Sequence, residues 1–161
     1  MKIVRIYVDG SYNPSEKIGA WAFIIVENNE VVFENSKSFN KKEYSSMTIN
    51  KMEMHAVHAS INYLRSNGYK PNKQLFYLFT DSQYVHLGYN AFLERRKANS
   101  NNKTLWLFLE KILESFTEFK SLFIQWIPSD SRDIYHQRAH ELCQISMKNY
   151  LNNKINVVSK L

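Results

Sequence analysis

Cysteine is almost absent from this chain of 161 residues, in which Cys143 is the single thiol. One thiol excludes a framework of intrachain disulfides, and its place in an amphipathic pattern predicts a small core residue. Glycine and proline are scarce, with four and three residues, and no linker or repeat is evident. No apolar run approaches the roughly 20 residues that span a bilayer, and no signal peptide precedes the first strand pattern. We therefore expect a soluble cytoplasmic protein with no membrane partner.

Hydrophobic residues make up 44% of the chain, including ten Phe, ten Tyr and three Trp, which is enough for one core. We predict a single domain over residues 1–151, followed by a tail or helix extension over residues 152–161. The formal net charge of +6 favours a polyanionic partner, nucleic acid first. A biased genome composition would give the same surplus of lysine, so charge alone does not decide the partner.

The hydrophobic pattern predicts an α/β fold with a mixed five-stranded sheet flanked by helices. Apolar or β-branched runs predict strands at residues 2–8, 19–26, 31–36, 75–79 and 122–126. Helical spacing predicts helices at residues 48–67, from residue 83, at 105–116 and at 135–151. We expect the order βββαβαβα, counting the helical region between the fourth and fifth strands once. Because crossovers between parallel strands are right-handed, strands one, four and five should be parallel, with the sheet order 3-2-1-4-5.

Carboxylates follow two strands that this order places side by side. Asp9 comes at the end of the first strand and Asp81 at the end of the fourth, each followed by a small polar pair. Glu53 lies on the first helix, at the edge of its apolar stripe. Each residue alone would be an ordinary turn, cap or surface charge. Three converging carboxylates repel one another unless a cation joins them, so the set predicts a Mg²⁺ or Mn²⁺ site.

This pattern resembles the type 1 ribonuclease H family over most of the chain. The matching segments are residues 9–11 with Asn13 and Pro14, 19–22, 48–53, 80–85, 105–106, Trp126 and 138–142. The resemblance implies that family's ribonuclease H-like fold and its activity, which is endonucleolytic cleavage of the RNA strand of an RNA–DNA hybrid. In that reaction two divalent ions activate a water that attacks phosphorus and leaves a 5′-phosphate and a 3′-hydroxyl.

The resemblance also implies roles for particular residues. Asp9, Glu53 and Asp81 would be catalytic metal ligands. A second group would contact the hybrid, several of its members near the 2′-hydroxyls that distinguish RNA from DNA: Gly10, Ser11, Asn50, Ser82 and Gln83. A short basic segment, Arg95, Arg96 and Lys97, stands where many members have a longer basic protrusion. It would either contact phosphates or be a solvated helix end.

His140 stands where the family has its fourth carboxylate. Three interpretations are open. His140 is a catalytic metal ligand that biases the site towards Mn²⁺, or Glu141 or Asp133 compensates, or the site is crippled and the protein only binds hybrid or double-stranded RNA. We favour the first. Retention of the other three carboxylates argues against a pure binding module, because clustered negative charge opposes a phosphate backbone.

The loop before the last helix is a second departure. The family often has a mobile histidine there, and Asp130 falls at its place, where we expect an ordinary loop residue. His136, at the start of the last helix, is predicted to be a surface residue, and Trp126 to belong to the core. We expect a monomer. A resolvase or integrase core on the same fold is a further alternative, disfavoured by the polar pairs that follow Asp9 and Asp81.

Overall fold

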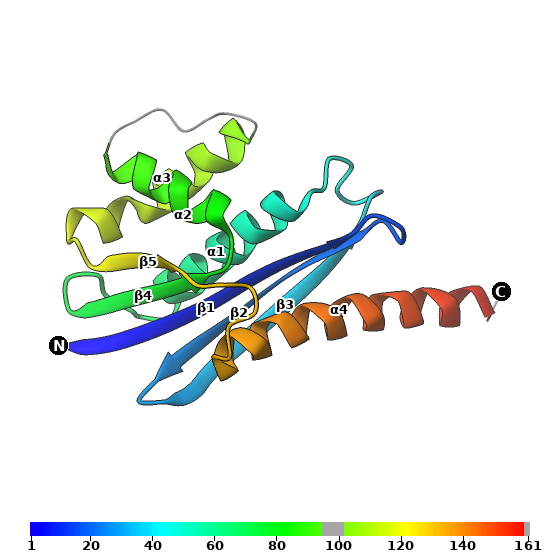
Figure 1. Ribbon diagram of the computed structural model, residues 1–161, viewed down its shortest axis with the longest axis horizontal. Coiled ribbons are helices and arrows are strands. Elements are labelled where there is room, and N and C mark those ends of the chain that lie inside the picture. Colours follow the sequence, from blue (N-terminus) through cyan, green and yellow to red (C-terminus); the bar gives the residue numbers. More distant parts are fainter. Residues whose placement is uncertain (95–101, 160–161) are drawn as a thin grey trace.

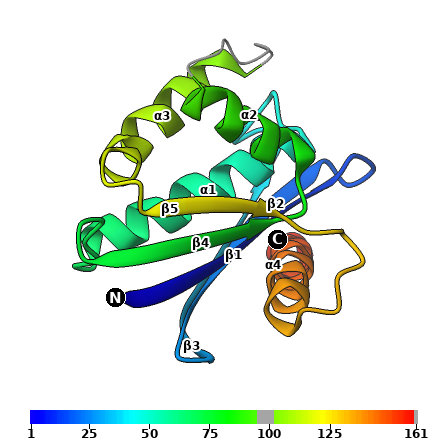
Figure 2. The same ribbon diagram turned by 60° about the vertical axis from the view of Figure 1, so that its left-hand side comes forward.

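The computed structural model describes residues 1–94 and 102–159, and the side chains of residues 1–94 and 102–153. Helices cover both faces of a five-stranded sheet (Figures 1 and 2). In chain order the elements are β1 (Lys2–Asn13), β2 (Ile18–Glu27), β3 (Glu30–Asn40), α1 (Ile49–Ser66), β4 (Gln74–Thr80), α2 (Gln83–Leu93), α3 (Lys103–Glu118), β5 (Leu122–Trp126) and α4 (Ile134–Ser159). The predicted sheet order β3-β2-β1-β4-β5 is confirmed, with β1, β4 and β5 parallel.

Two separate helices, α2 and α3, stand between β4 and β5. The order is therefore βββαβααβα, with one helix more than the predicted order counted. The apolar spacing stops after Leu93 and resumes at Leu105, and the polar stretch between them separates the two helices. Residues 95–101 of that stretch lie outside the described part of the chain, and so do the predicted phosphate contacts of residues 95–97.

β1 is longer than its apolar run predicts. Its parallel pairing with β4 ends at Tyr7 and Phe79, but its antiparallel pairing with β2 continues to Asn13 and Ile18. The polar end of the strand is held by backbone hydrogen bonds to β2, which need no apolar side chains. The pairing of β1 with β4 therefore ends just before Asp9, and the two strands separate there in the middle of the sheet.

The helices form two layers. α1, α2 and α3 cover one face of the sheet, whereas α4 alone crosses the other face over β1, β2 and β3 (Figure 2). Arg138 of α4 donates two hydrogen bonds to the carboxylate of Glu34 on β3, at 2.8 and 3.1 Å. Further along, Asn40 Nδ2 donates to Tyr150 Oη at 2.6 Å. These contacts fix how α4 lies across the sheet, and the helix continues to Ser159 (Figure 1).

In the part of the chain that the structure describes, every helix is too short or too polar to span a membrane. The main core lies between the sheet and the layer of α1, α2 and α3. Cys143, on α4, is buried against β2 in a smaller cluster, in line with its predicted role as a core residue.

Candidate active site

The register of β1 and β4 brings Asp9 and Asp81 to the same level. The last paired residues are Tyr7 and Phe79, and each aspartate lies two positions further along its strand direction. Two neighbouring parallel strands thus present carboxylates at one point, where an α/β sheet commonly places its ligands. This is the convergence that the sequence predicted.

Gly10 lets the third carboxylate approach. A Cβ atom at Gly10 would lie 2.3 Å from the backbone nitrogen of Glu53, far inside contact distance. A residue without a side chain is therefore required for α1 to pack this closely against β1. As a result Glu53, which is only 4% exposed, comes down beside Asp9.

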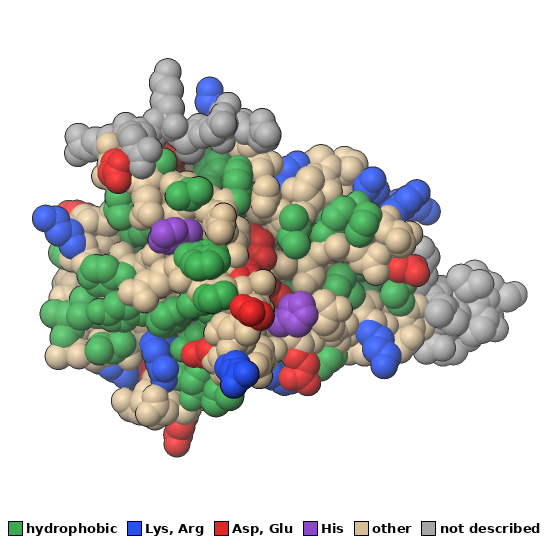
Figure 3. Space-filling view, in the orientation of Figure 1, with side chains coloured by type: hydrophobic (Ala, Val, Ile, Leu, Met, Phe, Trp, Pro, Cys, Tyr) green, Lys and Arg blue, Asp and Glu red, His purple; other side chains and the backbone are tan. Residues whose placement is uncertain are grey.

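The carboxylates open on a groove of about 410 Å³. Figure 3 shows acidic side chains and a histidine gathered near the centre of the face that it presents. The lining residues are Asp9, Gly10, Ser11, Ile49, Asn50, Glu53, Asp81, Ser82, Gln83, Tyr84 and His140. Every predicted metal ligand and every predicted hybrid-contacting residue, apart from the three basic residues at 95–97, thus lines one groove.

Helix caps hold the walls of this groove. Thr48 caps α1 by accepting a hydrogen bond from the Lys51 backbone at 3.2 Å, and Ser82 caps α2 in the same way. The Trp126 indole donates to the backbone oxygen of Asp81 at 3.1 Å. Trp126 is 41% exposed, so its predicted place in the core was wrong. Its indole needs an acceptor, and at the end of the edge strand β5 it finds one in the loop that carries Asp81.

Burial and mutual repulsion disfavour the ionised forms of Asp9 and Glu53. Burial, followed by the charge of Asp81, raises the pKa of Asp9 to about 6, against the opposing effect of His140. Burial and the charges of Asp9 and Asp81 raise the pKa of Glu53 well above its ordinary value. Within the described residues Glu53 Oε2 has no hydrogen-bond partner. The buried carboxylates therefore have too little compensating positive charge around them, which suits a bound cation.

His140 lies at the mouth of the groove. Its Nδ1 is 3.2 Å from Asp9 Oδ2, and its side chain is 61% exposed. The expectation that His140 stands beside the carboxylates is thus met by the geometry. Whether its imidazole binds a metal ion remains a prediction.

His136 is a second residue that sequence reasoning placed wrongly. It is 2% exposed rather than a surface residue, because α4 presses its first turn against the sheet. Its Nε2 lies 3.4 Å from Asp81 Oδ2. Donor atoms of Asp9, Asp81 and His136 all fall within 4.8 Å of one another. A signal was available in the sequence, since His136 precedes His140 by four positions and so shares its helix face.

The RNase H family profile matches residues 1–146. The chain belongs to the RNase H family. It is similar to the ribonuclease H of Ehrlichia chaffeensis, with 29% identity over 148 residues that cover 88% of this chain and 92% of that protein. The ribonuclease H of Ehrlichia ruminantium is 24% identical over 150 residues, with the same coverage of both chains.

Solved structures share the fold. LC11-RNase H1, isolated from compost by a metagenomic approach, superposes with a TM-score of 0.71 at 20% identity and covers 94% of this chain and 99% of its own. LC11-RNase H1 in complex with an RNA/DNA hybrid gives a TM-score of 0.67 at 19% identity, covering 92% and 99%. The predicted ribonuclease H-like fold is therefore confirmed.

Neither acidic neighbour of His140 takes over the fourth carboxylate position of the RNase H pattern. The Glu141 side chain is 59% exposed and pairs with Arg138 at 3.2 Å. Asp133 accepts hydrogen bonds from the backbone of Tyr135 and His136 and so caps α4. Neither residue lines the groove. The compensation hypothesis is therefore not supported. Asp130 is exposed in the loop before α4, as predicted.

Proposed function

We propose that this member of the RNase H family is an endonuclease that hydrolyses the RNA strand of RNA–DNA hybrids with the help of divalent metal ions. One observation carries the proposal. The three carboxylates share a single groove with Gly10, Ser11, Asn50, Ser82 and Gln83, the residues that the family resemblance assigns to the hybrid. A groove that combines cation ligands with small polar groups suits a phosphodiester flanked by 2′-hydroxyls.

The residues present fit a divalent cation. The donor set is dominated by carboxylate oxygens, the pKa values of Asp9 and Glu53 are raised, and within the described chain Glu53 Oε2 lacks a partner. Asp9, Glu53 and Asp81 would hold the metal, with His140 at the fourth position. Bound divalent ions would supply an activated water and stabilise the leaving oxygen. An imidazole at the fourth position favours Mn²⁺ over Mg²⁺ relative to a carboxylate.

The walls of the groove would orient the substrate. Ser11 and Ser82 offer hydroxyls, and Asn50 and Gln83 offer amides that can both donate and accept hydrogen bonds. Such groups can pair with a 2′-hydroxyl, which is itself both donor and acceptor, and thereby select RNA over DNA. The net charge of +6 favours the approach of a polyanion. LC11-RNase H1, a protein of similar fold, was solved with an RNA/DNA hybrid.

The alternative is a hybrid-binding module without catalysis. The observation in its favour is His140, whose imidazole replaces a carboxylate at the mouth of the groove. The burial of Asp9 and Glu53 argues against it. Buried, repelling carboxylates destabilise a fold and oppose phosphate binding, so a protein that merely bound nucleic acid would gain nothing from them.

Cleavage of a labelled RNA–DNA hybrid tests the proposal, in Mg²⁺ and separately in Mn²⁺. Wild type should cleave, Asp9→Asn should not, and His140→Asp should shift the preference towards Mg²⁺. If wild type binds hybrid but does not cleave it with either metal, the protein is a binding module and not a nuclease. A monomeric state and a cytoplasmic location also remain proposals, and light scattering coupled to gel filtration measures the first.

A further inference from the structure

His136 is a buried imidazole with an unsatisfied nitrogen. The residue is 2% exposed, and its Nε2 makes a long ion-pair contact of 3.4 Å with Asp81 Oδ2 but no well-formed hydrogen bond to any described residue. A buried polar atom without a well-formed hydrogen bond destabilises a fold. A histidine that served only to pack α4 would find a partner for this nitrogen or be replaced by an apolar residue. The position of Nε2 therefore calls for an explanation.

The direction of the ring supplies one. Nε2 lies 3.4 Å from Asp81 Oδ2, and His136 is not among the residues that line the groove. One oxygen of Asp9, one oxygen of Asp81 and a ring nitrogen of His136 lie within 4.8 Å of one another. Ligand atoms around a shared ion at about 2.1 Å are separated by up to about 4.2 Å, so small side-chain adjustments suffice.

We propose that His136 is a ligand of the divalent metal site, binding through Nε2 together with Asp9 and Asp81. An ion at this place would give Nε2 a direct partner and offset the repulsion between the two carboxylates. Imidazole is a softer ligand than carboxylate, so this ion would be Mn²⁺ in preference to Mg²⁺. The metal bias would thus have a second source in the buried His136, beside the exposed His140 at the fourth position.

The spacing of His136 and His140 is consistent with one buried and one exposed imidazole beside the carboxylates. His136 and His140 are four residues apart on α4 and so project from one face of the helix, a turn apart. The inner ring is buried against Asp81, and the outer ring, 61% exposed, meets Asp9 at the mouth. Because Arg138, between them, is held by Glu34 of β3, the helix cannot rotate freely to exchange the two rings.

The catalytic role of this ion rests on the proposed hybrid cleavage, but the coordination of the ion by His136 does not. The test therefore measures metal binding without nucleic acid. Mn²⁺ is added to the full chain, and pulsed electron paramagnetic resonance records nitrogen coupling to the metal in unlabelled protein and in protein with ¹⁵N-labelled histidine. A difference between the two samples identifies an imidazole ligand.

The matched variants are His136→Gln and His140→Gln. We expect the isotope-dependent coupling in wild type and in His140→Gln. In His136→Gln, where only His140 remains beside the carboxylates, we expect a weaker coupling together with at least a roughly tenfold weaker Mn²⁺ affinity. If His136→Gln does not fold, retention of the coupling in His140→Gln still assigns it to His136. Loss of the coupling in His140→Gln, its absence in Mn²⁺-bound wild type, or failure of wild type to bind Mn²⁺ overturns the inference.

Failure of the proposed function gives a different result. If wild type shows the nitrogen coupling but cleaves no hybrid, His136 is still a metal ligand and the proposed nuclease function is wrong. Conversely, if wild type cleaves hybrid but shows no nitrogen coupling, the nuclease function holds and His136 is not a metal ligand.

Discussion

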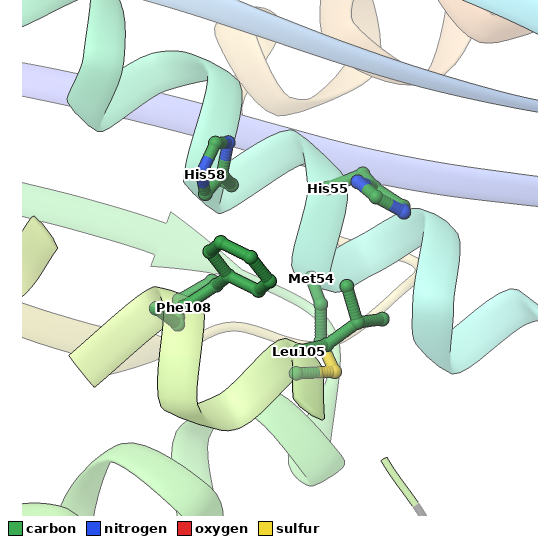
Figure 4. A pocket seen from close by; sticks show the side chains of 6 residues that line it. Met54, His55, His58, Leu105 and Phe108 are labelled. Carbon is green, nitrogen blue, oxygen red and sulfur yellow. The ribbon is translucent and has the colours of Figure 1, made fainter. Parts of the chain in front are cut away.

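Two regions of this molecule hold pairs of histidines in opposite surroundings. At the groove, His140 meets Asp9 at the mouth and the buried His136 meets Asp81. The second region is an apolar pocket of about 250 Å³ between α1 and α3 (Figure 4). It is lined by Met54, His55, His58, Leu105, Phe108 and Leu109, with no carboxylate among them.

The same side chain responds differently in the two places. The Asp81 carboxylate raises the pKa of His136 despite burial. Burial lowers the pKa of His55 and of His58, and nearby positive charges lower them further. Next to the carboxylates of the groove, the protonated form of a histidine is therefore favoured. In the apolar pocket, the neutral form is favoured. Neighbouring charge, more than residue type, decides which cluster can hold a cation.

The largest expected effect comes from removing a charge from the groove. Asp81→Asn should reduce hybrid cleavage by at least about a thousandfold, the scale expected when one member of a catalytic unit is lost. His58→Leu, in the pocket, should change it less than about twofold. Initial cleavage rates of the two variants measure the contrast, after thermal unfolding has shown that both variants are folded at the assay temperature. Comparable activity of the two variants would erase the functional distinction between the regions.

Gly10→Ala should be the most destabilising change near the groove. Its Cβ would meet the Glu53 backbone at 2.3 Å, so β1 and α1 must separate, at a cost of about 2–3 kcal/mol. Gly68→Ala is the control, because nothing lies within 4 Å there and its φ of +80° gives a backbone cost of about 1–2 kcal/mol. Urea unfolding compares the stabilities. Cleavage should fall with Gly10→Ala alone, and an equal fall in both would contradict the packing argument.

The pH dependence of stability should have opposite signs in the two regions. A carboxyl whose pKa is raised on folding binds protons more tightly in the folded state, so its contribution is lost as pH rises. In EDTA, the groove should therefore lower the unfolding free energy between pH 4 and neutrality. Asp9→Asn should remove part of this trend and gain roughly 1–3 kcal/mol at pH 7.5. Parallel curves for wild type and variant would argue against a raised pKa.

The smallest effect should come from the pocket. A histidine whose pKa is lowered on folding contributes stability above its unfolded pKa, about 6.5, and this is lost as pH falls. His58→Leu should therefore gain about 0.5 kcal/mol over wild type between pH 7 and pH 5. Denaturant unfolding at both pH values measures the gain, and added Mn²⁺ should leave it unchanged. A gain that grows towards high pH would have the wrong sign.

Local patterns were sufficient for much of the fold and of the site. β5 occupies residues 122–126 as predicted, and Asn28 and Asn29 take φ values of 50° and 63° in the hairpin between β2 and β3. The convergence of Asp9 and Asp81 followed from strand order alone, because parallel neighbours end at the same edge. The extension of β1 to Asn13 was missed, since pairing with β2 depends on backbone hydrogen bonds that leave no mark in the side-chain pattern.

By itself, the sequence determined which chemical groups are present and which strand ends carry them. Only the tertiary structure decided their depth. His136 is buried and His140 exposed although one helical turn separates them, and no local pattern distinguishes the two. The difference arises from how α4 lies across the sheet. Arg138 with Glu34 and Tyr150 with Asn40 set that position through contacts between residues 104 and 110 positions apart, which only the folded chain brings together.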